Sequence, residues 1–169
     1  MADEQSRGRP RRTIGVLFVC TGNICRSPTA AGVFRTMVSR VGLSERFHID
    51  SCGTFSGHVG RPPDPRAQDH ALRRGYDIGE IRARLLRADD FVTFDHLLAM
   101  DEGQLQVLRR MATPPTRERA RLFLDFAPNL PTREVPDPYY GEAADFERAL
   151  DLIERGAASL LVAVRKELK

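Results

Sequence analysis

The sequence contains no tryptophan, only three cysteines among its 169 residues, and no long apolar run. A membrane-spanning helix needs about 20 consecutive apolar residues, and no segment approaches that length, so we expect no membrane insertion. Cys20, Cys25 and Cys52 are too few, and odd in number, for the disulfide framework of a small secreted domain. Cys20 and Cys25 also lack the further cysteine or histidine ligands of a zinc or iron–sulfur site, so we expect no metal or other cofactor.

Excess charge of one sign is also absent from most of the chain. The net charge is +3, and residues 1–12 hold most of it because four arginines there oppose two acidic residues. The nearly neutral remainder lacks the basic surface typical of nucleic-acid-binding proteins, so we expect no nucleic-acid partner. We interpret residues 1–12 as a disordered basic tail without the apolar centre of a secretory signal, which favours a cytoplasmic location.

The hydrophobic pattern predicts strands that alternate with helices. The expected strands are 14–19, 47–52, 94–100 and 121–126, and the expected helices are 28–41, 64–74, 85–89, 102–111 and 143–167. This alternation is typical of a three-layer αβα fold with a four-stranded parallel twisted sheet and helices on both faces, of the Rossmann-like or flavodoxin-like type. We therefore expect one α/β domain over residues 13–169.

The chemical centre of the sequence is a strand that ends in a cysteine, followed by a short loop and a helix. Five residues separate Cys20 from Arg26. A loop this short can direct backbone N–H groups inward and bind an anion with support from the helix dipole. Arg26 adds a planar donor for two phosphoryl oxygens, and a nearby cation and helix N-terminus favour a cysteine thiolate. We predict that this loop binds a phosphate dianion and that Cys20 attacks it.

The remaining residues of the loop support this interpretation. Ser27 is the expected N-cap of helix 28–41, and its hydroxyl can donate to the Cys20 thiolate. Asn23 tolerates a left-handed backbone and can hydrogen-bond its neighbours, so it can hold the loop in shape. Besides Cys20 and Arg26, the predicted phosphate-binding loop comprises Thr21, Gly22, Asn23, Ile24, Cys25 and Ser27. Because ligands bind at the carboxyl ends of parallel strands, residues 51–53 and Asp101 should lie beside it.

The segment Val16–Pro28 closely resembles the signature of the low-molecular-weight protein tyrosine phosphatases. In that family the signature stands near the N-terminus and the acid near the C-terminus, and Asp137-Pro138-Tyr139-Tyr140-Gly141 resembles its acid loop. The resemblance extends over residues 14–165. It implies hydrolysis of protein phosphotyrosine and aryl phosphates through a phosphocysteine on Cys20. Arg26 and the loop amides would bind the phosphate, and Asp137 would act as general acid and then as base.

The resemblance also implies a deep cleft for a phenyl ring, walled by Tyr139 and Tyr140 and contacted by Ile24. Many relatives carry a tryptophan where this chain has Gly57, and we expect Phe55 to supply the missing aromatic wall. Asp64 and Asp101 are interpreted as braces of their loops. The four histidines are interpreted as surface or structural residues; they are His48, His58, His70 and His96.

Regulation and partners follow from the same resemblance. In the family, the residue that matches Cys25 can form a reversible disulfide with the nucleophile, so Cys25 is a candidate redox partner that protects Cys20 from over-oxidation. The implied partners are phosphotyrosine-containing proteins, with inorganic phosphate and vanadate as competitive ligands. Relatives in bacteria act against tyrosine kinases or on host proteins, which makes a bacterial tyrosine kinase one candidate partner.

Two alternative functions remain on the sequence alone. An arsenate reductase of the same fold would use a similar loop, but its chemistry passes a disulfide along further cysteines, and none follows Cys52. A non-catalytic phosphate or phosphotyrosine binder would be expected to have lost Cys20, Arg26 or Asp137, and all three are present. The phosphatase is the favoured interpretation.

Overall fold

The continuous apolar run after Thr13 forms the central strand of the protein. The structure, a computed structural model, describes residues 11–169, so most of the predicted tail, residues 1–10, lies outside the described residues. All seven residues of this strand, β1 (Ile14–Cys20), are buried. It pairs in parallel with β2 (Phe47–Gly53) on one side and with β3 (His96–Ala99) on the other. With β4 (Ala120–Leu122) the sheet has the order β2-β1-β3-β4, which confirms the predicted four-stranded parallel sheet.

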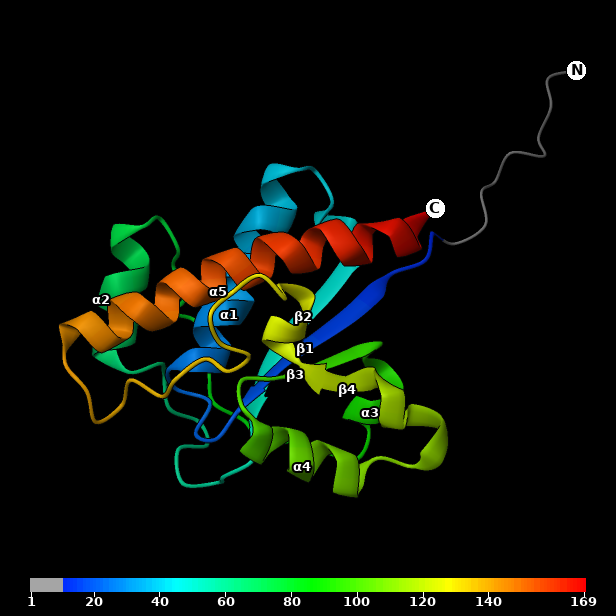
Figure 1. Ribbon diagram of the computed structural model, residues 1–169, viewed down its shortest axis with the longest axis horizontal. Helices are drawn as coiled ribbons and strands as arrows, with labels where there is room; N and C mark the ends of the chain where they lie inside the picture. The colour runs from blue at the N-terminus through cyan, green and yellow to red at the C-terminus, as the bar shows by residue number, and fades with distance from the viewer. Residues whose placement is uncertain (1–10) are drawn as a thin grey trace, which may run out of the picture.

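Helices cover both faces of the sheet, as the pattern predicted (Figure 1). The helices α1 (Arg26–Arg40) and α5 (Ala143–Val164) pack together on one face, with α2 (Pro65–Arg73) against them. The helix α4 (Glu102–Met111) lies on the other face beside β3 and β4, near the short α3 (Asp90–Thr93). The 3₁₀ helices are η1 (Ser44–Arg46), η2 (Pro114–Arg119), η3 (Phe123–Phe126) and η4 (Arg165–Leu168).

Alternate residues of β1 belong to two separate hydrophobic clusters. Val16 and Phe18 face the cluster that contains α1 and α5, whereas Leu17 and Val19 face the cluster of α4. Successive side chains of a strand point to opposite faces, so a strand covered on both faces is apolar throughout. This explains why the sequence of β1 is an unbroken apolar run.

The predicted strand 94–100 is shortened to His96–Ala99 and the predicted helix 143–167 ends at Val164, and two further predicted elements differ more from the structure. The predicted strand 121–126 ends at Leu122, because the chain turns into η3 and places the Phe123 ring edge-on against Phe18, with ring centroids 5.3 Å apart. The predicted helix 85–89 is wrong. The chain from Arg84 to Leu86 instead runs extended beside Gly53. The Gly53 N–H donates to the Arg84 carbonyl, and the Leu86 N–H donates to the Gly53 carbonyl. Helix α3 begins only at Asp90.

The carboxyl ends of β1, β2 and β3 meet at one rim. Cys20 is in register with Gly53, and Met100, just after β3, donates its N–H to the Val19 carbonyl. The loop after η3 returns to the same rim, since the Val135 N–H donates to the Met100 carbonyl at 2.9 Å. Within residues 11–169, no helix combines the length and apolar character needed to cross a membrane.

Candidate active site

The loop between β1 and α1 closes tightly around the sulfur of Cys20. Asn23 adopts a left-handed backbone, which this residue type tolerates, with φ of 55°. Its N–H donates to Cys20 Sγ at 3.3 Å, and Ser27 Oγ lies 2.9 Å from the same sulfur. The predicted contact between Ser27 and the nucleophile is therefore confirmed. The N-cap role predicted for Ser27 is wrong, because the tight loop starts α1 at Arg26 and leaves Cys25 at the cap.

The amide of Asn23 uses its donors and its acceptor to hold the loop. Nδ2 donates to Ser27 Oγ at 2.8 Å and to Ser51 Oγ at 2.9 Å, while Oδ1 accepts from the Arg84 N–H at 3.0 Å. A buried polar group whose bonds are satisfied is costly to move. The guanidinium of Arg84 is in turn held by the buried carboxylate of Asp90. These contacts fix Asn23 and Ser27 beneath the sulfur.

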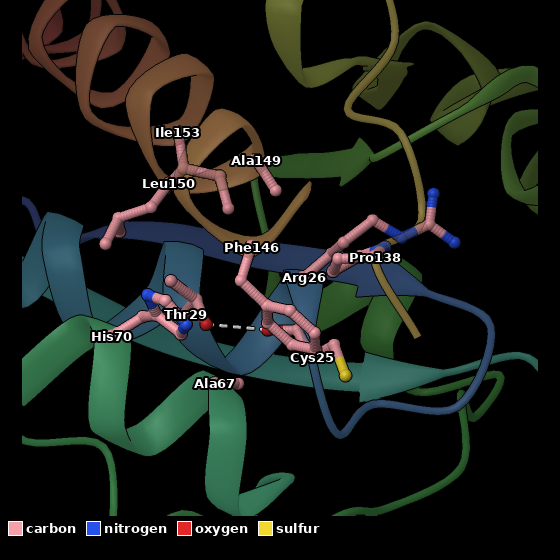
Figure 2. A pocket seen from close by; sticks show the side chains of 10 residues that line it. All are labelled: Cys25, Arg26, Thr29, Ala67, His70, Pro138, Phe146, Ala149, Leu150 and Ile153. Carbon is pink, nitrogen blue, oxygen red and sulfur yellow. Dashed lines mark hydrogen bonds between the residues drawn. The ribbon is translucent and has the colours of Figure 1, made fainter. Parts of the chain in front are cut away.

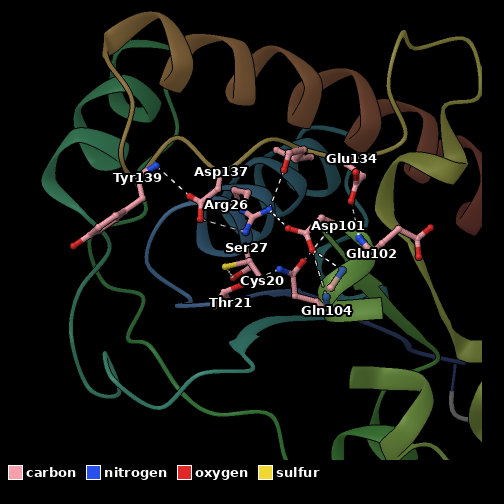
Figure 3. A network of polar contacts seen from close by, with 12 residues as sticks. Cys20, Thr21, Arg26, Ser27, Asp101, Glu102, Gln104, Glu134, Asp137 and Tyr139 are labelled. Atoms are coloured by element: carbon pink, nitrogen blue, oxygen red, sulfur yellow. Dashed lines mark hydrogen bonds and ion pairs between the residues drawn. The ribbon is translucent and has the colours of Figure 1, made fainter. Parts of the chain in front are cut away.

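Two segments outside α1 hold the side chain of Arg26 (Figure 3). Its side chain is only 4% exposed, and Nη1 donates to Asp101 Oδ2 at 2.6 Å and to the Val135 carbonyl at 3.0 Å. Nη2 faces the carboxylate of Asp137, with 3.5 Å between Nη2 and Oδ2. The guanidinium therefore lies between the carboxylate that anchors it and the carboxylate predicted as the acid.

The start of α4 holds both ends of the phosphate-binding loop. Asp101 caps α4 in a capping box with Gln104 and also binds Arg26, so the bracing role expected for Asp101 is confirmed. Gln104 is buried, and its Nε2 donates to Thr21 Oγ1 at 2.9 Å. Partial burial acts to raise the pKa of Asp101, but hydrogen bonding and charge attraction from Arg26 outweigh it and lower that pKa. Gln104 was not foreseen, because nothing in its sequence context distinguishes it from other helix-capping glutamines.

A cavity of about 380 Å³ opens over the loop and gathers most of the predicted site. Cys20, Arg26 and Asp137 lie in its lining, which brings together the nucleophile and acid that are far apart in the sequence. The predicted wall residues also line it; they are Ile24, Phe55, Tyr139 and Tyr140. Asn23 and Ser27 do not line the cavity and instead support the loop from below.

Aromatic rings form the mouth of this cavity. An ideal Cβ at Gly57 would lie 2.2 Å from Cε1 of Phe55, so the Phe55 ring occupies the space of a side chain at position 57. The ring of His58 lies between Phe55 and Tyr139, at centroid distances of 6.0 Å and 6.4 Å. His58 therefore belongs to the site, which the sequence interpretation missed. Its position in the loop after β2, at the carboxyl edge of the sheet, is the signal that could have indicated it.

The other three histidines have structural contacts, as the sequence interpretation expected. His70 is buried, stacks on Phe146, and places Nδ1 2.5 Å from Glu147 Oε1. His96 pairs with Glu167 at 2.9 Å, and the ring of His48 stacks on Phe94. In the part of the chain that the structure describes, no group of three or more His, Cys, Asp or Glu side chains is arranged to hold a metal ion.

Cys25 is a free, buried thiol that lines the same cavity as the nucleophile. Burial is the main cause that raises its pKa to about 12, and the carboxylates of Asp64 and Asp137 and the thiolate of Cys20 act in the same direction. Behind it, between α1, α2 and α5, a second cavity of about 20 Å³ has room for little more than one water molecule (Figure 2). This inner cavity is too small for an aryl phosphate.

Comparison with known proteins agrees with this geometry. Residues 15–169 match the family described as low molecular weight phosphotyrosine protein phosphatase. The low molecular weight protein-tyrosine-phosphatase YfkJ of Bacillus subtilis is 37% identical over 154 residues, which cover 91% of this chain and 97% of YfkJ. The human low molecular weight phosphotyrosine protein phosphatase is 41% identical over 137 residues, which cover 80% of this chain and 85% of the human protein.

Solved structures give the same result. The crystal structure of YfkJ superimposes with a TM-score of 0.87 and covers 95% of this chain and 98% of its own. The structure of Vibrio vulnificus Wzb in complex with benzylphosphonate, 26% identical, superimposes with a TM-score of 0.78 and covers 89% of this chain and 99% of Wzb. The chain therefore belongs to the low molecular weight phosphotyrosine protein phosphatase family and is an enzyme of that family.

Proposed function

We propose that the protein hydrolyses the phosphotyrosine of protein substrates, and simple aryl phosphates, in two steps through a phosphocysteine on Cys20. The observation that carries this proposal is the convergence of three groups on one cavity. Cys20, Arg26 and Asp137 line it, and Arg26 Nη2 lies 3.5 Å from Asp137 Oδ2. A nucleophile, an anion clamp and an acid are the parts that this chemistry requires.

In the first step the Cys20 thiolate attacks phosphorus in line with the leaving oxygen. The S–P bond forms as the P–O bond to the phenol breaks, and Asp137 donates a proton to the leaving oxygen. Arg26 and the loop N–H groups stabilise the charge on the three equatorial oxygens. Because Arg26 is already fixed by Asp101 and Val135, little reorganisation accompanies the reaction.

In the second step Asp137, now a carboxylate, accepts a proton from water as the water oxygen attacks phosphorus. The S–P bond breaks, phosphate leaves and the Cys20 thiolate returns. The hydroxyl of Ser27, 2.9 Å from Cys20 Sγ, stabilises the thiolate as a leaving group. Asp137 is well placed to meet water, since its side chain is 49% exposed.

The shape of the cavity favours aryl over alkyl phosphates. Ile24 of the loop lines the cavity together with Tyr139 and Phe55, and these side chains can sandwich a flat ring. A phosphoserine is too short to reach Cys20 from outside such walls. The complex of Wzb with benzylphosphonate supports an aromatic ligand for this chain. Inorganic phosphate and vanadate should compete for the same loop.

Redox control and a cytoplasmic location complete the proposal. Cys25 is a free thiol next to the nucleophile and is proposed to form a reversible disulfide with oxidised Cys20. All three cysteines are buried and free, as expected in a compartment that keeps thiols reduced. A bacterial tyrosine kinase is proposed as one protein substrate.

Hydrolysis of p-nitrophenyl phosphate in the presence of EDTA tests the function. We expect turnover by the wild type and none by Cys20→Ser, with vanadate as a competitive inhibitor. Because Arg26 and the loop N–H groups remain in place, a correctly folded Cys20→Ser protein should still bind phosphate. A wild type as inactive as Cys20→Ser would reject the phosphatase and leave the non-catalytic binder.

A further inference from the structure

The first turn of α2 carries an ion pair that touches the phosphate-binding loop. Asp64 caps α2 and accepts from Arg66 at both carboxylate oxygens, from Nε at 3.1 Å and from Nη2 at 2.9 Å. The N–H of Asp64 donates to the carbonyl of Ile24 at 2.8 Å. The hydrogen bond from Arg66 is the main cause that lowers the pKa of Asp64, so the pair is ionised at neutral pH.

The same guanidinium also reaches the loop that carries Asp137. Arg66 Nη2 donates to the Tyr139 carbonyl at 3.0 Å, and the guanidinium lies over the rings of Tyr139 and Phe146, at 5.6 Å and 4.7 Å from their centroids. Tyr139 in turn holds the carboxylate, because its N–H donates to Asp137 Oδ1 at 3.1 Å. A continuous line of contacts therefore joins Ile24 to Asp137.

Few other hydrogen bonds hold the backbone of the acid loop, residues 136–141. Val135 is anchored to Met100, and α5 begins at Ala143. Among hydrogen bonds between described residues, the bond from Arg66 is the one that reaches the backbone of 136–141 from outside this stretch, whereas the backbone of Glu142 is bonded to Asp145 and Phe146 of α5. The remaining bonds there, such as the Gly141 N–H to the Pro138 carbonyl, are internal and do not fix the stretch relative to the phosphate-binding loop.

We propose that Arg66 is a positioning residue for the general acid: the Asp64–Arg66 pair is a strut that sets the acid loop at a fixed distance from the phosphate-binding loop. This inference rests on the proposed function, because it assumes that Asp137 donates the proton. Proton transfer requires the carboxyl within hydrogen-bond reach of the leaving oxygen, and a displacement of about 1 Å can cost up to about a hundredfold in rate. Arg66 itself touches neither the phosphate nor the leaving group.

The exposure of the Arg66 guanidinium supports a geometric rather than a stabilising role. The Arg66 side chain is 46% exposed although the Asp64 side chain is only 10% exposed, and solvent at the guanidinium screens the pair, so it contributes little to the free energy of unfolding. A planar fork is nonetheless suited to bind the Asp64 carboxylate and a carbonyl at once, which a lysine ammonium does with less directional control. Loss of the ion pair should therefore affect proton transfer from Asp137 more than the free energy of unfolding.

The dependence of kcat/KM on the pKa of the leaving phenol measures the acid specifically. Acid assistance matters most for poor leaving groups, so its loss slows phenyl phosphate more than p-nitrophenyl phosphate. The variants to compare are Arg66→Gln, Asp64→Asn and Asp137→Ala. Arg73→Gln is the matched control, because Arg73 makes an exposed ion pair with Asp69 on the same helix and does not contact the acid loop.

We expect Arg66→Gln to lower kcat/KM about tenfold for phenyl phosphate and less than about threefold for p-nitrophenyl phosphate. Asp64→Asn should act in the same direction, since it keeps the helix cap and the charge of Arg66 but removes the ion pair. The inhibition constant of inorganic phosphate and the thermal midpoint should stay at the wild-type values in both variants. Arg73→Gln should match the wild type throughout.

The outcomes separate the strut from the proposed function. If Asp137→Ala shows no steeper dependence on the leaving group, Asp137 is not the acid and the proposed function is wrong in that respect. If Asp137→Ala steepens the dependence but Arg66→Gln behaves like Arg73→Gln, the proposed function stands and the strut is rejected. Equal loss for all substrates with weakened phosphate inhibition would also reject it, because Arg66 would then act on the phosphate-binding loop.

Discussion

The guanidinium of Arg26 is tied to the carboxylate of Asp101, with 2.6 Å between Nη1 and Oδ2. Asp101 also caps α4, so one side chain orients both the anion clamp and the helix that contacts Thr21 through Gln104. The arrangement is comparable to the outer shell of a metal site, since the residue that touches the ligand is aimed by a residue that does not.

Replacement of Asp101 by asparagine should weaken this clamp. The amide side chain would keep one acceptor and lose the charge that holds Arg26, so we expect the inhibition constant of phosphate to rise about tenfold, the scale of one charge-assisted hydrogen bond. Glu102→Gln, at the exposed neighbouring position, is the control. Unchanged phosphate inhibition in Asp101→Asn would show that Val135 alone suffices to orient Arg26.

The same pair predicts a dependence of stability on pH. The pKa of Asp101 is lower in the folded protein than in the unfolded chain, so its contribution to the free energy of unfolding is complete above the unfolded value of about 3.9 and is lost as pH falls through the folded value. Between about pH 5 and about pH 3, denaturant unfolding should therefore show a larger loss in the free energy of unfolding for the wild type than for Asp101→Asn. An equal loss in both proteins would contradict the assignment.

The aromatic mouth predicts a coupled pair at Phe55 and Gly57. A methyl group in Gly57→Ala should push the Phe55 ring aside, which costs little stability because that ring is exposed at the far end of a free side chain. We expect KM for aryl phosphates to rise about threefold, in keeping with the loss of one aromatic contact. In a Phe55→Ala background, Gly57→Ala should not raise KM further. Additive effects would show that the two positions act separately.

Cys25 should react with oxidised Cys20 faster as pH rises. Its pKa is raised to about 12, so only a small fraction is thiolate at neutral pH, and the rate of disulfide formation should increase about tenfold per pH unit from about pH 7 to about pH 9. Quenched-flow oxidation by peroxide, followed by mass spectrometry, measures this rate. Cys25→Ser is the control and should lose activity irreversibly; full recovery of that variant with added thiol would reject the protective role.

The sequence was sufficient where a local signal and the global arrangement coincide. The apolar run of β1 forms the expected buried strand, and Asn23 adopts the left-handed backbone that this residue type tolerates. Contacts between distant segments could not be predicted from the sequence. Nothing local indicates that Gln104 meets Thr21, or that Arg66 meets Tyr139, because each depends on how separate loops return to the same rim.

The errors have the same origin. Ser27 has the residue type and the position of an N-cap, yet its hydroxyl is bonded to Asn23 and lies beside Cys20. Phe123 continues an apolar pattern typical of a strand, but its ring is needed between Phe18 and Gly156, so the backbone turns. In both cases a tertiary contact overrides the local preference.

The phosphocysteine itself is the most direct test of the mechanism. Asp137→Ala, mixed with a substrate whose phenol leaves readily, should be phosphorylated quickly and hydrolysed slowly, because the second step also needs the base. After rapid quenching in denaturant, mass spectrometry should find one phosphoryl group on the peptide that contains Cys20, and none in Cys20→Ser. A phosphoryl group on another residue, or turnover by the wild type without any on Cys20, would contradict the mechanism.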